Sequence, residues 1–261
     1  MSFKFLKLQR ADTIATLSLN RPECGNALSL ALMQEIIDVV TTFKYDTTVR
    51  VIIFRGEGKH FSVGADLKDP ARHDQSQDST IARRVRETQL GRELIESILN
   101  INQISIAAVQ GAAAGGAACI ASACDFRVGS DDCIIGYPEV KLGMNLSWGS
   151  LPLCYNLVGP AVAKRMVIGG ELEAATDLLH WGFLDELVSA SDLEKKSLEM
   201  AGFYASRPAM AAQMIKRGLN AIQLAGSAGV MHADGDQFAL ASLSDDYQQA
   251  RTEFLAAREK K

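Results

Sequence analysis

Apolar and polar residues alternate at the start of the chain and then recur at helical spacing. The alternation predicts two strands, over residues 3–10 and 13–19. Apolar residues at helical intervals predict an amphipathic helix over residues 29–43. Continuous apolar runs predict buried strands at residues 51–54 and 104–109.

The second half of the chain changes character. A helix predicted over residues 83–100 leads into the strand at 104–109, and the repeated strand-strand-helix turns indicate an α/β fold that spirals. Strand signals vanish from residue 193 onward. The helices expected there cover residues 200–206, 209–224, 229–243 and 247–260. We therefore expect an α/β core over residues 1–190 and a helical C-terminal part over residues 191–261.

One long polar stretch, residues 69–80, interrupts this pattern. It carries too little apolar surface to form part of a core, so a surface loop is expected. The loop is either a mobile segment beside a functional site or a plain solvated connection.

Composition narrows the class of protein. The chain has 261 residues, 48% of them hydrophobic, and this is enough for a full core. A net charge of −4 argues against a nucleic-acid partner. Five cysteines without a C-x-x-C pair indicate reduced thiols, and no apolar run is long enough for a membrane helix or a signal peptide. A cytoplasmic protein without a membrane partner is expected.

The segment from Gly111 to Cys119 is the most informative, because no side chain between these two residues is larger than that of alanine. It follows a buried strand and is expected to open a helix. Backbone N–H groups at a helix start lack internal partners, and tiny side chains leave them open to an anion or a developing oxyanion. A tightly packed structural helix is the alternative.

Four sequence blocks together identify a family. They are residues 19–29, which contain LNRP and NALS, residues 60–67 (HFSVGADL), the glycine-rich segment, and residues 137–143 (YPEVKLG). In order and spacing these blocks resemble the crotonase (enoyl-CoA hydratase/isomerase) superfamily over essentially the whole chain. The resemblance implies a crotonase-like spiral fold, an acyl-CoA thioester as substrate, and a homotrimer or hexamer held by the helical C-terminal part. It implies no cofactor apart from the coenzyme A of the substrate.

By position in these blocks, the resemblance implies that the amides of Ala65 and Gly116 bind the thioester oxygen. Glu139 is implied as the catalytic base, and the apolar residues that follow it indicate a partly desolvated carboxylate with a raised pKa. The residues expected to contact the substrate are Gly64, Asp66, Leu67, Gly115, Cys119 and Trp148. Trp148 is expected to cover the acyl group, although a tryptophan in the core without ligand contact is equally compatible with the sequence.

The chain departs from the hydratase pattern at Cys119, where typical hydratases carry a second glutamate. Hydration uses two carboxylates, whereas one carboxylate suffices to move a proton between two carbons. The single Glu139 therefore favours isomerisation of 3-enoyl-CoA to 2-enoyl-CoA. The alternatives are a hydratase that uses Glu139 alone and a non-catalytic protein that binds acyl-CoA.

Two other readings of the same residues are disfavoured. The glycine-rich segment does not satisfy G-x-G-x-x-G, so a dinucleotide site is not expected. No spacing of histidines, cysteines and carboxylates suggests a metal site. Cys119 itself is neutral at ordinary pH and is expected to line the site rather than act as a base.

Overall fold

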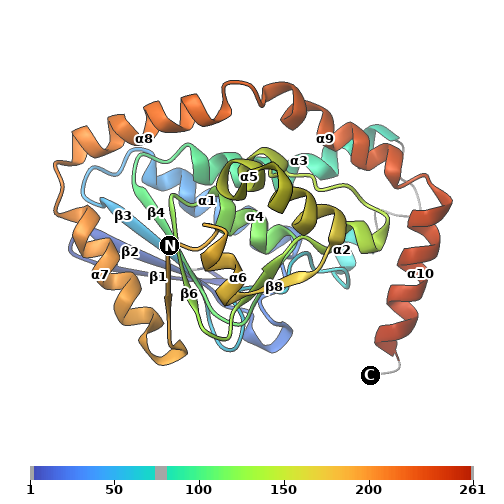
Figure 1. Ribbon diagram of the computed structural model, residues 1–261, viewed down its shortest axis with the longest axis horizontal. Helices are drawn as coiled ribbons and strands as arrows, with labels where there is room; N and C mark the ends of the chain where they lie inside the picture. Colours follow the sequence, from blue (N-terminus) through green and yellow to red (C-terminus); the bar gives the residue numbers. More distant parts are fainter. Residues whose placement is uncertain (1–2, 74–80, 260–261) are drawn as a thin grey trace.

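The computed structural model describes residues 3–73 and 81–259, and within them the larger of two sheets has six strands in the order β1-β2-β3-β4-β6-β9. Their bounds are β1 (Leu6–Ala11), β2 (Ile14–Leu19), β3 (Val51–Gly56), β4 (Ile104–Val109), β6 (Phe126–Ser130) and β9 (Glu186–Val188). The first two strands pair antiparallel, and the others join in parallel. The strands expected from alternation and from apolar runs are all in this sheet (Figure 1).

A smaller sheet lies beside it, in the order β5-β7-β8. It consists of β5 (Ala112–Ala114), β7 (Ile134–Gly136) and β8 (Leu172–Ala174). The glycine-rich segment therefore does not open directly as a helix, since β5 precedes the helix α4 (Gly116–Ala123). Because Ala112–Ala114 pair with β7, the helix begins at Gly116, five residues after Gly111. The same pairing fixes the position of the first turn of α4.

The remaining helices surround these sheets. They are α1 (Leu30–Phe43), α2 (Pro70–His73), α3 (Ile81–Leu99), α5 (Leu151–Gly169), α6 (Ala175–His180), α7 (Leu193–Ala205), α8 (Ala209–Leu224), α9 (Ala228–Ala241) and α10 (Asp245–Glu259). The sequence did not indicate α5, which has a kink at Gly159 followed by Pro160. It also gave too late a start for α7 and no sign of α2, which lies in the stretch expected to be a loop; residues 74–80 of that stretch lie outside the described residues.

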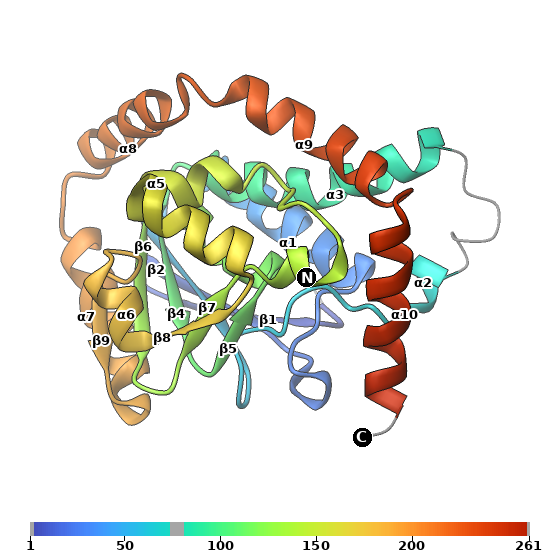
Figure 2. The same cartoon turned by 45° about the vertical axis from the view of Figure 1, so that its right-hand side comes forward.

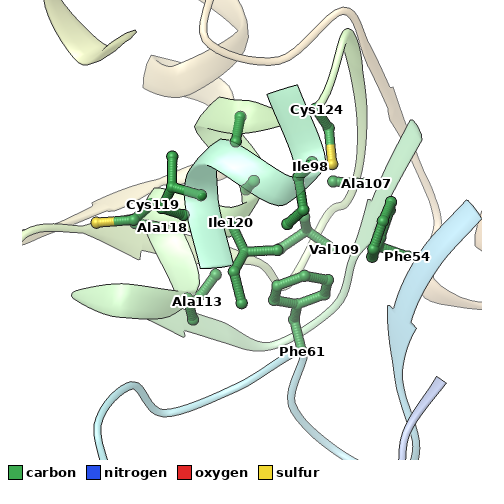
Figure 3. Close-up of a cluster of buried hydrophobic side chains, with 14 of the residues drawn as sticks. Phe54, Phe61, Ile98, Ala107, Val109, Ala113, Ala118, Cys119, Ile120 and Cys124 are labelled. Atoms are coloured by element: carbon green, nitrogen blue, oxygen red, sulfur yellow. The ribbon is translucent and has the colours of Figure 1, made fainter. Parts of the chain in front are cut away.

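Both faces of the larger sheet are covered, as parallel strands require. On one face α1, α3 and α4 enclose a core in which Phe54, Phe61 and Ile120 are at most 3% exposed (Figure 3). On the other face α7 packs against the strands, with Leu193 and Ala201 buried. This packing holds β4 and the start of α4 firmly in place.

The helical C-terminal part wraps around the outside of the core. Figure 1 shows α8 and α9 running over the helical face and α10 turning down at one end. The helix α10 contacts η2, the 3-10 helix Pro138–Leu142. Figure 2 shows the same arrangement after a 45° turn. In the described part of the chain the last strand ends at Val188, close to the boundary expected near residue 190. None of the helices described combines the length and apolar character needed to cross a bilayer.

Candidate active site

The loop that carries Ala65 is held between two neighbours. On one side the Leu28 amide donates to Gly64 O at 2.8 Å, and the Asp66 amide donates to Leu28 O at 3.0 Å. Because Leu28 binds the groups on either side of Ala65, the N–H of Ala65 points away from Leu28. The described residues offer this N–H no hydrogen-bond acceptor.

The start of α4 lies against the same loop. A methyl group on Gly64 would come within 2.4 Å of Ala114 O, so only glycine allows the two backbones to approach this closely. Gly115 is in the left-handed region with φ +56°, and its amide donates to Gly136 O at 2.9 Å. The amide of Gly116 then stands in the first turn of α4, where no acceptor for it is found among the described residues. The two N–H groups predicted to bind the thioester oxygen thus belong to segments in direct contact.

Glu139 approaches this helix start from η2. A methyl group on Gly115 would lie 2.8 Å from Glu139 Oε1, so the carboxylate rests directly on the backbone of α4. Its Oε2 is buried and has no hydrogen-bond partner in the described structure. Burial raises the pKa of Glu139 from 4.5 to about 7. A carboxylate with this pKa beside two open amide donors is suited to general base catalysis near neutral pH.

Cys119 is 1% exposed on α4, one turn after Gly115, whose carbonyl accepts a hydrogen bond from the Cys119 amide at 3.0 Å. In Figure 3 its sulfur points away from Phe61 and Val109. Burial, and secondly the charge of Glu139, raise the pKa of the Cys119 thiol well above its usual value. The thiol is therefore neutral and cannot replace a carboxylate as a base, and its role in lining the site stays a prediction.

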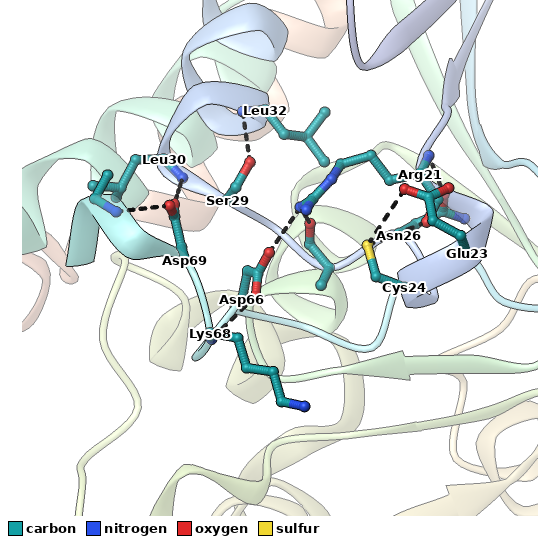
Figure 4. A network of polar contacts seen from close by, with 12 residues as sticks. Arg21, Glu23, Cys24, Asn26, Ser29, Leu30, Leu32, Asp66, Lys68 and Asp69 are labelled. Carbon is teal, nitrogen blue, oxygen red and sulfur yellow. Dashed lines mark hydrogen bonds and ion pairs between the residues drawn. The ribbon is translucent and has the colours of Figure 1, made fainter. Parts of the chain in front are cut away.

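The predicted substrate contacts fall into two groups. Gly64, Gly115, Cys119 and Trp148 belong to or contact the two segments that carry the two amides: Gly64 precedes Ala65, Gly115 and Cys119 flank Gly116 on α4, and a methyl group on Gly116 would come within 2.3 Å of Trp148 Cζ3. The carboxylate of Asp66 is instead paired with Arg21 at 2.9 Å, and both side chains are less than a fifth exposed (Figure 4). Arg21 also donates to Ala27 O, so this ion pair shapes the loop before Leu67. Substrate contacts of Asp66 and Leu67 stay predictions.

Three residues that the sequence did not assign to the site support it. Asn26, completely buried, donates to Glu57 O and His60 O and accepts from the Arg21 amide. His60 Nδ1 accepts a hydrogen bond from the Ala112 amide at 3.0 Å, and this bond ties the loop to β5. Asn26 belongs to the block at residues 19–29 that carries the family resemblance, and this position could have marked it as a residue that supports the site.

The third of these residues is Asp234 of α9, which is 6% exposed. Its Oδ2 accepts a hydrogen bond at 2.5 Å from the amide of Gly149, the residue that follows Trp148. Nothing in the sequence connects two residues 85 positions apart. The contact arises only because α9 folds back over the core.

Comparison with known proteins identifies the family. The family model for enoyl-CoA hydratase/isomerase matches residues 9–261. Crotonyl-CoA hydratase of Syntrophomonas wolfei subsp. wolfei is 29% identical over 260 residues, which cover 99% of this chain and 97% of that protein. Trans-2-decenoyl-[acyl-carrier-protein] isomerase of Streptococcus mutans is 30% identical over 195 residues, 75% of this chain and 73% of the other.

Solved structures agree as well. An enoyl-CoA hydratase from Mycobacterium avium subsp. paratuberculosis K-10 matches with a TM-score of 0.86 at 24% identity, covering 98% of this chain and 97% of the other. That likeness establishes the fold. The family match over almost the entire chain establishes the rest: the protein belongs to the enoyl-CoA hydratase/isomerase family, the crotonase-type enzymes.

Proposed function

We propose that this enzyme converts 3-enoyl-CoA into 2-enoyl-CoA, with Glu139 as its single acid–base group. The observation that carries the proposal is the pairing of Glu139 with a neutral, buried Cys119 on the facing helix turn. A site of this kind can remove a proton and return it. It has no second carboxylate at position 119 to activate a water molecule.

The reaction follows from the groups present. The Glu139 carboxylate takes a proton from C2 of the 3-enoyl thioester, and the electron pair moves into the thioester carbonyl to give an enolate. The N–H groups of Ala65 and Gly116 donate hydrogen bonds to the enolate oxygen. The enolate then reforms the carbonyl, the double bond moves from C3–C4 to C2–C3, and the protonated Glu139 returns the proton to C4. Atoms and charge balance without an added reagent.

Hydration of 2-enoyl-CoA is the second candidate, because the relative from Syntrophomonas wolfei is named a crotonyl-CoA hydratase. In that reaction Glu139 would have to act on a water molecule held by backbone groups. At identities of 29% over 99% of the chain to a hydratase and 30% over 75% of the chain to an isomerase, the relatives do not decide between the two chemistries. The preference for isomerisation therefore rests on Cys119.

Product analysis with 2-enoyl-CoA and 3-enoyl-CoA side by side separates the two. We expect rapid migration of the double bond from 3-enoyl-CoA and slow formation of 3-hydroxyacyl-CoA. Efficient hydration together with an untouched 3-enoyl-CoA would transfer the assignment to the hydratase. Absence of turnover with both, while acyl-CoA binds, would indicate the non-catalytic alternative.

Cys119→Glu tests whether the missing second carboxylate is what limits hydration. A carboxylate at this position would stand near Glu139, and the repulsion between them would raise one of the two pKa values, so that one group holds a proton while the other activates water. Hydration should rise relative to isomerisation. Cys119→Gln, similar in size but without the charge, is the control and should not gain hydration.

The proposed chemistry needs no cofactor other than the coenzyme A that the substrate brings. Dialysis against a metal chelator should leave the isomerisation rate unchanged. A rate that falls and recovers on addition of a divalent cation would contradict the proposed mechanism.

A further inference from the structure

Trp148 lies in a slot between two glycines on different helices. A methyl group on Gly91, in the middle of α3, would come within 2.1 Å of Trp148 Nε1 and Cε2. A methyl group on Gly116 would come within 2.4 Å of Cζ3 and Cη2, on the other edge of the same ring. The indole therefore bridges from α3 to the first turn of α4. Either glycine, replaced by any other residue, would push it out.

The backbone of Trp148 adopts a conformation that is unfavourable for a tryptophan. Trp148 has φ +65°, a left-handed conformation that bulky side chains rarely adopt. Among the described residues, the other non-glycine positions with positive φ are Asp12 and Asn26, whose short polar side chains tolerate it. Such an outlier persists only where its surroundings enforce it. Here the buried Asp234 enforces it by binding the next amide, Gly149.

The position of the ring matters because Gly116 is a proposed donor to the thioester oxygen. The Cα of Gly116 faces the six-membered part of the indole, while Gly115, one residue earlier, faces Glu139. The reacting carbons of a bound thioester must lie between these groups. Further carbons of the acyl chain then meet an indole that is only partly exposed and already packed on the core.

We propose that Trp148 restricts this enzyme to short-chain acyl-CoA thioesters by filling the space beside Gly116. The restriction rests on the proposed thioester site, whose amides fix where the acyl chain begins. Gly91 and Asp234 act as positioning residues, since the first leaves room for the ring and the second holds its backbone.

Equilibrium binding of saturated thioesters tests this without any turnover. Butyryl-CoA, decanoyl-CoA and free CoA are titrated into the full-length protein by calorimetry. Each methylene that becomes buried strengthens binding by about fourfold. We expect butyryl-CoA to bind more tightly than CoA, and decanoyl-CoA to bind no more tightly than butyryl-CoA. In Trp148→Ala, decanoyl-CoA should gain at least about tenfold over butyryl-CoA.

Two further variants separate the effect of ring size at position 148 from a general loss of packing in the core. Trp148→Phe keeps an aromatic ring but shortens it, and should give an intermediate gain. Trp181→Phe changes the other of the chain's two tryptophans, which packs against Arg165 outside the site, and should bind like the unmodified protein. In that variant Trp148 is the remaining tryptophan, so its fluorescence should change when butyryl-CoA binds.

The outcomes separate the two proposals. If the unmodified protein binds decanoyl-CoA more tightly than butyryl-CoA, or if Trp148→Ala and Trp148→Phe leave the ratio of the two dissociation constants unchanged, the role of Trp148 is wrong and the isomerase proposal stands. If neither thioester binds more tightly than free CoA, the thioester site itself is wrong, and the restriction by Trp148 is wrong with it.

Discussion

At the residue scale, the proposed chemistry depends on Glu139 as the single acid–base group. Its Oε2 is buried without a hydrogen-bond partner in the described structure, and Oε1 lies against Gly115. A buried carboxylate with one unpaired oxygen is costly for folding and valuable for proton transfer. These two consequences can be measured separately.

Glu139→Gln should abolish turnover and leave binding almost intact. The amide cannot take a proton, and general base catalysis of this kind is worth roughly 10²–10⁴ in rate. Steady-state kinetics should show the loss in kcat, while calorimetric binding of butyryl-CoA stays within a few-fold of the unmodified protein. A variant with near-normal turnover would mean that another group is the base.

The raised pKa of Glu139 also predicts two pH profiles. Catalysis needs the carboxylate, so kcat/KM should rise with pH up to about 7 and then level off. For stability, the folded-state pKa lies above the ordinary value of 4.5, so the folded protein binds more protons than the unfolded chain between these values. The free energy of unfolding should therefore fall by about 3 kcal/mol as pH rises through this window.

Urea unfolding of Glu139→Gln isolates this contribution. The variant cannot ionise at position 139, so its stability relative to the unmodified protein should increase between pH 5 and pH 8. Equal pH dependence of the two proteins would show that Glu139 titrates normally.

At the element scale, the loop that carries Ala65 is held by backbone pairing along both of its edges. Leu28 pairs with one edge and β5 with the other, through the bridges Leu28–Ala65 and Ser62–Ala113. The Arg21–Asp66 ion pair and the His60–Ala112 hydrogen bond hold its two ends. The loop is therefore preorganised, so that a donor at Ala65 needs no rearrangement to meet an oxyanion.

Asp66→Asn should weaken this hold and lower kcat more than it raises KM. The ion pair is largely buried, so its loss should shift the loop and with it the amide of Ala65. A shift of about 1 Å in a reacting group can cost about 10²-fold in rate. Lys7→Met is the matched control, because the Lys7–Glu57 pair lies at the surface with Lys7 half exposed. Equal kinetic effects of the two substitutions would show that the loop does not depend on Asp66.

At the scale of the whole molecule, α8 leaves an apolar face uncovered. Ile215, Leu219 and Ile222 follow helical spacing and are 62%, 60% and 75% exposed in the single chain. An apolar stripe of this kind indicates a protein interface. We propose that it contacts further copies of this chain in a trimer or hexamer.

Light scattering should accordingly give a mass that is three or six times that of the chain. The double change Ile215→Glu with Leu219→Glu places charges in the stripe and should reduce the mass toward that of one chain. Lys195→Glu, on an exposed part of α7, is the control and should not alter it. A monomer in the unmodified protein would contradict the interface.

Local patterns explain how much could be predicted from the sequence. Alternation and apolar runs predicted β1 to β4, and helical spacing predicted α1, α3 and the C-terminal helices, because burial of one face depends on residues close together in the chain. The short strand β5 and the helix α5 were missed. β5 is an alanine run that forms a strand only because β7 pairs with it, and α5 contains a glycine and a proline that ordinarily end helices.

The sequence by itself determined the family, the fold class and the identity of the candidate residues Ala65, Gly116 and Glu139, since these depend on ordered local blocks. Only the tertiary structure decided how these residues meet. It brought Glu139 against Gly115, buried Cys119 beside them, and set Trp148 between Gly91 and Gly116. The physical reason is that burial, pKa and close approach depend on atoms contributed by segments far apart in the chain, and no local pattern specifies them.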